Sequence, residues 1–61
     1  MINVVLYLKS GKSIIASCTE DDFGELYGIW EKCFDGMASH GIMAFENCVV
    51  RAEDVSVIEY V

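Results

Sequence analysis

The spacing of apolar residues changes along the chain, and each change predicts a new element of secondary structure. Residues 2–8 are rich in β-branched and aromatic side chains, which is typical of a strand. Ser10 and Gly11 predict a two-residue hairpin loop, because glycine adopts positive φ without a steric cost. Residues 13–18 then predict the returning strand.

The next segment has helical spacing. Thr19 is a good N-cap, and acidic residues at positions 20–22 suit the positive end of the helix dipole. Gly36 predicts the C-terminal cap, so the helix is expected to end at Phe34 or Asp35. The apolar stripe of this helix comprises Phe23, Leu26, Tyr27, Trp30, Cys33, Phe34 and Met37.

The rest of the chain predicts short strands. Residues 36–41 form a loop, and residues 42–46 and 48–52 are two strands separated by a turn at Asn47. One turn of 3₁₀ helix at residues 52–54 leads into a last strand at 56–60. The order β-β-α-β-β-β predicts a single α+β domain over residues 1–61, with one amphipathic helix on one face of an antiparallel sheet, either open or curled towards a barrel.

Both faces of the predicted first hairpin are apolar. With a two-residue loop, Tyr7 is opposite Ile14 and Val5 is opposite Ala16, so these four side chains share the face turned away from Leu6. A single helix covers only one face of a sheet. We therefore expect a homo-oligomer, most simply a dimer, in which Val5, Tyr7, Ile14 and Ala16 make the contact. The alternative is a monomer with scattered exposed apolar residues.

Charge narrows the choice of partner. The chain has 10 acidic and 4 basic residues, a formal net charge of −6. Nucleic-acid binding needs clustered Lys and Arg to neutralise phosphates, and an anionic membrane surface needs the same. Direct nucleic-acid binding and membrane binding are therefore not expected, and a protein with a basic or apolar surface is the expected partner. The alternative is that the charge serves solubility alone.

The helix carries the candidate partner-binding residues. Gly24 and Gly28 lie one turn apart, and glycine costs about 1 kcal/mol relative to alanine at such positions, which suggests that another backbone approaches there. Acidic residues accompany them and could imitate phosphates, although dipole complementarity also explains those at the helix start. The predicted site comprises Glu20, Asp21, Asp22, Gly24, Glu25, Gly28 and Glu31.

No pattern of residues indicates catalysis or a bound cofactor. Cys18, Cys33, Cys48 and His40 lack the paired spacing of a structural zinc site, so core cysteines are the preferred interpretation and no metal is expected. No nucleophile motif or phosphate-binding glycine loop is present, and we expect a non-enzymatic protein. The N-terminus does not have the layout of a signal peptide, so we expect reduced thiols and a cytoplasmic location.

The segment from Phe45-Glu46-Asn47 to Glu59, and the final strand Val55-Ser56-Val57-Ile58-Glu59-Tyr60, resemble the short acidic open reading frames of phages and prophages of Gram-positive bacteria. This resemblance implies an inhibitor or regulator of a host protein, such as a defence or nucleic-acid-processing protein, acting in the bacterial cytoplasm. Two other classes remain open. One is a small-molecule binder, for example of a nucleotide signal, with its ligand at the oligomer interface; the other is a structural accessory subunit.

Overall fold

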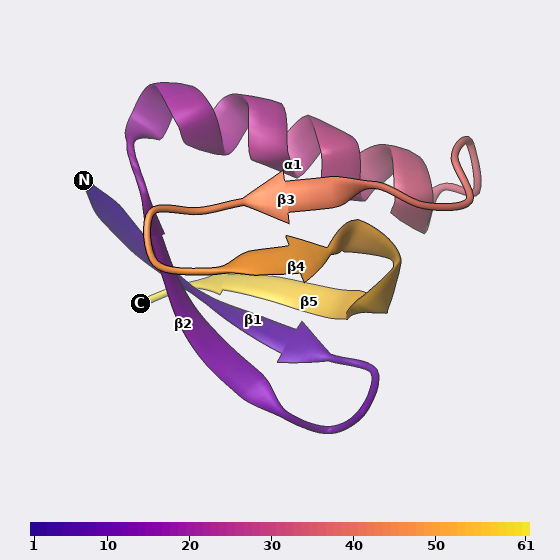
Figure 1. Cartoon of the computed structure of the whole chain (residues 1–61), viewed down its shortest axis with the longest axis horizontal. Coiled ribbons are helices and arrows are strands. Elements are labelled where there is room, and N and C mark those ends of the chain that lie inside the picture. The colour runs from indigo at the N-terminus through magenta and orange to yellow at the C-terminus, as the bar shows by residue number, and fades with distance from the viewer.

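The computed structural model describes all residues from Met1 to Val61 and confirms an α+β fold with one α-helix and five antiparallel strands (Figure 1). The strands pair into two sheets. One has three strands in the order β2-β1-β5, and the other is the hairpin β3-β4. The elements are β1 (Ile2–Leu8), β2 (Ser13–Cys18), α1 (Glu20–Phe34), β3 (Ile42–Ala44), β4 (Val49–Arg51), the 3₁₀ turn η1 (Ala52–Asp54) and β5 (Val55–Tyr60).

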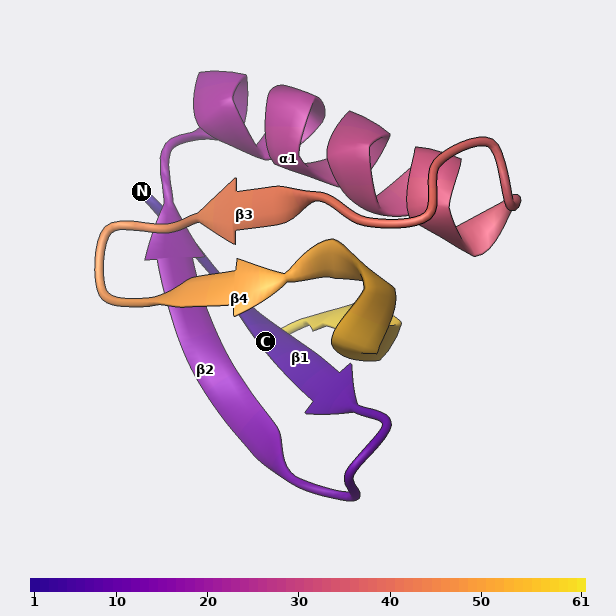
Figure 2. The same ribbon diagram turned by 45° about the vertical axis from the view of Figure 1, so that its right-hand side comes forward.

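The three-stranded sheet is open and does not close into a barrel. Strand β1 is its centre, and β2 and β5 are its two edges. The β3-β4 hairpin crosses in front of this sheet, beneath the helix (Figure 2). Strands β3 and β4 are each three residues long, shorter than expected. Between their ends and the turn at Asn47, one backbone hydrogen bond remains, from the N–H of Phe45 to the carbonyl of Cys48 over 2.7 Å.

The loop of the first hairpin differs from the prediction by one residue. The N–H of Gly11 donates to the carbonyl of Leu8 over 2.9 Å, and the N–H of Leu8 donates to the carbonyl of Lys12 over 2.8 Å. Gly11 has φ +95°. This is a three-residue loop, in which a tight turn is followed by a glycine with positive φ. The predicted two-residue loop is therefore wrong.

The additional loop residue shifts the pairing of β2 with β1 by one residue relative to the prediction. Tyr7 is opposite Ser13, and Val5 is opposite Ile15. A shift of one residue turns every side chain of a strand to the other face. Ala16 is consequently fully buried and Ile14 is half-buried on the inner face, whereas Tyr7 is exposed on the outer face. The predicted contact of Val5, Tyr7, Ile14 and Ala16 on one common face is therefore wrong.

The outer face alternates polar with apolar residues and is open to water. Its apolar members are the neighbouring pairs Val5–Ile15 and Tyr7–Val57, and Ile15 is 60% exposed. The hydroxyl of Tyr7 donates to a carboxylate oxygen of Glu59 over 3.1 Å. The polar members of this outer face are Asn3, Ser13, Ser17 and Glu59.

Both ends of the helix are capped as the sequence predicts. The hydroxyl of Thr19 accepts the N–H of Asp22 over 3.1 Å. At the other end, the N–H of Met37 donates to the carbonyl of Lys32 over 2.8 Å, and Gly36 has φ +78°, which is the pattern of a Schellman cap. No helix of the structure has the length and apolar character needed to cross a membrane.

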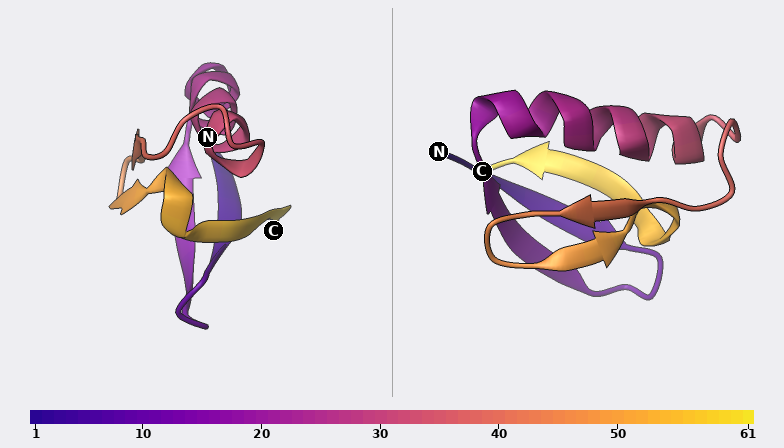
Figure 3. Two further views of the ribbon diagram at one scale, coloured as in Figure 1. Left: turned by 90° about the vertical axis from the view of Figure 1, so that its right-hand side faces the viewer. Right: turned by 45° about the horizontal axis from the view of Figure 1, so that its top comes forward.

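The helix and the β3-β4 hairpin together cover the inner face. Seen from the side, the hairpin and β5 lie on opposite sides of the molecule, with α1 above them (Figure 3). Gly41 allows the hairpin to approach the helix, since a Cβ there would lie 2.8 Å from Cγ2 of Ile29. The core consists of Val4, Leu6, Ala16, Cys18, Leu26, Met43, Phe45, Ala52 and Val55.

Candidate functional site

The two edges of the three-stranded sheet differ in how their backbone groups are satisfied. At the β2 edge, the side-chain oxygen of Asn47 accepts the N–H of Ser17 over 2.9 Å, and its amide donates to the carbonyl of Ile15 over 2.8 Å. The N–H of Glu46 donates to the carbonyl of Ser17 over 2.8 Å. The turn between β3 and β4 therefore covers this edge, as proteins commonly protect an edge strand.

The β5 edge is covered only at its start, where the indole N–H of Trp30 donates to the carbonyl of Val55 over 2.8 Å. The N–H of Val61 donates to the carbonyl of Asn3 over 3.3 Å, so the odd-numbered residues at this end of β5 direct their backbone groups towards β1. Because the backbone of an antiparallel strand alternates in direction, Ile58 and Tyr60 direct theirs away from the sheet. None of the backbone hydrogen bonds outside the helix and the strand ladders involves Ile58 or Tyr60.

Aromatic side chains line the helix beside this edge. Their ring centroids form a continuous series: Tyr60 lies 5.5 Å from Phe23, Phe23 lies 6.0 Å from Tyr27, Tyr27 lies 5.5 Å from Trp30, and Trp30 lies 5.1 Å from Phe34. The two ends of the series are open, since Tyr60 is 68% and Phe34 is 67% exposed. We call these five aromatic residues, together with the free edge of β5, the α1–β5 seam.

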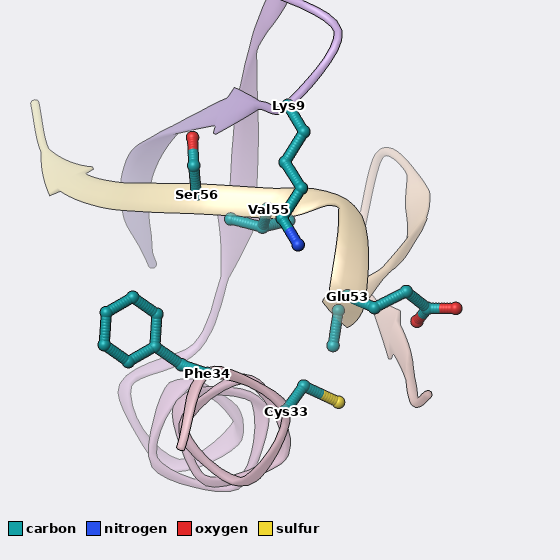
Figure 4. A pocket seen from close by; sticks show the side chains of 7 residues that line it. Lys9, Cys33, Phe34, Glu53, Val55 and Ser56 are labelled. Atoms are coloured by element: carbon teal, nitrogen blue, oxygen red, sulfur yellow. The ribbon is translucent and has the colours of Figure 1, made fainter. Parts of the chain in front are cut away.

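A cavity of about 240 Å³ opens at one end of the seam (Figure 4). The last turn of α1 contributes Cys33 and Phe34, and the start of β5 contributes Val55 and Ser56. The indole N–H of Trp30 donates to the carbonyl of Val55 over 2.8 Å and fixes the helix against the strand at this point. The remaining lining residues are Lys9, Ala52 and Glu53.

The predicted partner-binding residues lie on α1, but they do not form one surface. Gly24 and Glu31 are three residues before and four residues after Tyr27, a spacing that makes them its neighbours on a helix. Glu20 lies four residues before Gly24 and extends this border of the seam. All three are exposed. The other predicted residues, Asp21, Asp22, Glu25 and Gly28, lie further round the helix, away from the aromatic side chains.

The two helical glycines lie against no other part of the chain. A Cβ at Gly24 or at Gly28 would meet nothing within 4 Å. Within one copy of the protein, therefore, no backbone makes the close approach that these glycines suggested.

The apolar stripe of the helix is only partly buried, since Tyr27 and Phe34 are both exposed. The apolar stripe runs from Ile29 on one side to Tyr27 on the other, which is about 160° of the helix surface at 100° per residue. A three-stranded sheet and a short hairpin do not bury so wide a stripe. The width of the apolar stripe is the sequence feature that indicates that part of it lies outside the core.

The cysteines and the histidine form no centre. No group of three or more His, Cys, Asp or Glu residues is arranged to hold a metal ion. Burial raises the pKa of the Cys18 and Cys48 thiols, so both stay protonated at neutral pH and are poor nucleophiles and ligands in that form. His40 is exposed, and its Nδ1 lies 3.0 Å from the hydroxyl of Ser39, outside the cavity.

The fold and the seam together define a small α+β protein with one protected and one open sheet edge. No protein-family model matches the chain, and no curated protein sequence or solved structure matches it significantly.

Proposed function

We propose that this protein is a non-enzymatic interaction protein that inhibits or regulates a partner protein, and that it binds this partner through the α1–β5 seam. One observation carries the proposal: Phe34 and Tyr60 remain about two-thirds exposed, in a continuous series of aromatic contacts, beside an open sheet edge. Aromatic residues are enriched at the centres of protein interfaces, where they bury a large area. The cytoplasm of a bacterial host is the proposed setting, on the phage resemblance.

The charge around the seam supports a basic partner. Glu20 and Glu31 border the aromatic residues on the solvent side of the helix, and the whole chain carries a net charge of −6. Opposite charges on a partner would speed the encounter and select against acidic surfaces.

A small-molecule function has less support. The cavity beside Phe34 is about 240 Å³, below the range of about 300–1,000 Å³ that is usual for ligand pockets. Lys9 is the one cationic side chain among its lining residues. A nucleotide would therefore find little room and a single counter-charge.

Self-association remains part of the proposal, but its basis has changed. The observed register leaves Val5, Tyr7, Ile15 and Val57 as the apolar residues of the outer face and interleaves them with polar ones. Ile15 and Val57 thus take the places that the sequence suggested for Ile14 and Ala16. We propose that any homodimer forms through these four residues, which are separate from the α1–β5 seam.

The test is affinity capture from bacterial lysate with a tagged chain and matched variants. Phe34→Ser and Tyr60→Ser each remove an aromatic ring that is already exposed, so we expect the fold to survive. Val49→Ser is the control, because Val49 is 65% exposed on the β3-β4 hairpin and lies outside the seam.

The proposal requires one partner that the wild-type chain and Val49→Ser both retain, and that both seam variants lose. Addition of that partner's purified form should reproduce the same ranking of affinities. Equal capture by all four chains, or the absence of any captured protein across several hosts, would rule out the seam as the binding surface.

A further inference from the structure

We propose that the seam binds an extended segment of its partner as an additional antiparallel strand on β5, and that this segment alternates apolar residues with Lys or Arg. The inference rests on the proposed function and specifies the chemistry of the partner. It starts from the contrast between the two sheet edges: Asn47 and Glu46 cover β2, whereas Ile58 and Tyr60 direct unpaired backbone groups outwards from β5.

The backbone geometry determines which residues of the segment would bind. In an antiparallel pair, residues that exchange hydrogen bonds have side chains on the same face. Ile58 and Tyr60 pair with Leu6 and Val4, which are buried on the inner face. Residues of the added strand opposite Ile58 and Tyr60 therefore turn their side chains towards the helix, where the exposed aromatic rings favour apolar groups.

The intervening residues of the segment face the other side of the sheet. There they lie across from Glu59, which is exposed on the outer face. Opposite charges directly across two strands stabilise the pair, and like charges destabilise it. Glu59 thus favours Lys or Arg at these positions, and Glu20 and Glu31 add a negative field on the helix side.

Charge also argues against a second copy of the chain at this edge. Antiparallel pairing of two β5 strands would bring together two chains that each carry a net charge of −6. It would also place Glu59 of both copies on the same face of the joined sheet. A basic segment meets none of this repulsion, so it is the occupant that the charges of the seam favour.

The probe is a fluorescent peptide of alternating valine and lysine, about seven residues long, which is an ordinary strand length. Two N-methylated forms give a matched comparison. Methyl groups on the valine amides block the hydrogen bonds to β5, whereas methyl groups on the lysine amides point away from it. A peptide that alternates valine and glutamate tests the charge.

We expect the valine–lysine peptide to bind, and its lysine-methylated form to bind similarly. The valine-methylated form should bind about tenfold more weakly or worse, a loss of about 1.4 kcal/mol per factor of ten. In ¹⁵N NMR spectra, the amides of Ile58 and Tyr60 should shift and exchange more slowly with solvent. Glu31→Lys should weaken binding more than Glu25→Lys, which makes the same charge change away from the seam.

Three results would overturn strand addition. They are equal affinity of the two methylated peptides, shifts confined to outer-face amides such as Ile15, and no binding at millimolar peptide. Shifts of the Ile58 and Tyr60 amides that depend on protein concentration alone would assign the edge to a second copy. If capture from lysate still requires Phe34 and Tyr60 while the peptides fail, the seam binds its partner by another geometry and the proposed function stands.

Discussion

The side chain of Asn47 bonds to the backbone of Ser17 as a neighbouring strand would. Its oxygen accepts the Ser17 N–H over 2.9 Å, and its amide donates to the carbonyl of Ile15 over 2.8 Å. One side chain from the β3-β4 turn thereby satisfies a donor and an acceptor of an edge strand thirty or more residues away. The three-stranded sheet is consequently left with one edge for external pairing instead of two.

Asn47→Ala should destabilise the protein by about 1–2 kcal/mol, because a hydrogen bond contributes about 0.5–1.5 kcal/mol and two are lost at a partly solvated site. Urea denaturation of both proteins measures the difference. Asn47→Asp keeps the acceptor for Ser17 and loses the donor to Ile15, so its midpoint should fall between the other two. An Asn47→Ala protein as stable as the wild type would show that water replaces the side chain at no cost.

Loss of Asn47 should also expose β2 to other chains. An open edge strand is a template for intermolecular pairing, so Asn47→Ala should aggregate sooner than the wild type at equal concentration. Light scattering during mild heating follows this, and amide exchange at Ser17 should accelerate in parallel. Faster amide exchange at Ser17 without aggregation would contradict this prediction. It would show that Asn47 stabilises β2 but is not needed to prevent pairing with other chains.

Gly41 and Gly24 should respond to alanine in opposite directions. A Cβ at Gly41 would lie 2.8 Å from Cγ2 of Ile29, so the helix or the hairpin must move. We expect Gly41→Ala to cost about 1–3 kcal/mol, as for other overpacked sites. Gly24→Ala places its methyl group in open space on an exposed helix turn and should gain about 0.5–1 kcal/mol. Thermal unfolding of both variants gives the comparison.

Gly24→Ala also tests the original reason for placing this glycine in the partner site. If a partner backbone approaches Gly24, the stabilised variant should capture less of that partner than the wild type does. Unchanged capture would leave Gly24 as a poor helix residue with no role in binding, and would restrict the site to the aromatic residues and their acidic neighbours.

Glu53 should contribute to acid sensitivity. Backbone hydrogen bonds, from its own N–H and from that of Gly41 at 3.2 Å, hold the pKa of this carboxyl below its usual value. Because the folded state lowers the pKa, the carboxylate stabilises the fold at neutral pH. That contribution disappears as the pH falls from the unfolded pKa through the lowered folded pKa. Glu53→Gln should therefore unfold with a shallower dependence on pH below about 4.5, followed by circular dichroism.

The sequence was sufficient for the fold class, both helix caps and the order of the elements. The Thr19 cap and the Gly36 cap are local structures, and each depends on residues within one helical turn. The register of the first hairpin, in contrast to the helix caps, could not be decided from the neighbouring residues alone. Two-residue and three-residue loops both fit the residues Lys9-Ser10-Gly11-Lys12, and the difference between them decided which residues of β2 were buried.

The candidate site was harder to foresee because it depends on what the rest of the chain leaves uncovered. Phe34 and Leu26 belong to the same apolar pattern along the helix, yet Leu26 is buried and Phe34 is 67% exposed. The hairpin carrying Met43 packs beneath one side of the helix and not the other, and its position follows from pairings across the whole chain. Similarly, nothing near Ser17 in sequence indicates that Asn47 covers its strand.

We expect any self-association of the protein to depend on the outer face of the sheet. Val5, Tyr7, Ile15 and Val57 form a contiguous apolar patch there, and Ile15 is its most exposed member. Ile15→Lys should lower any dimer population measured by sedimentation equilibrium, since it places a charge on the most exposed apolar residue of the contact. Its effect on stability should be small, because the side chain already lies largely in water.

Val49→Lys adds the same charge on the β3-β4 hairpin and should leave the association unchanged. A wild-type chain that sediments as a monomer at high micromolar concentration would show that the interleaved serines and Glu59 make the outer face polar enough to remain uncovered.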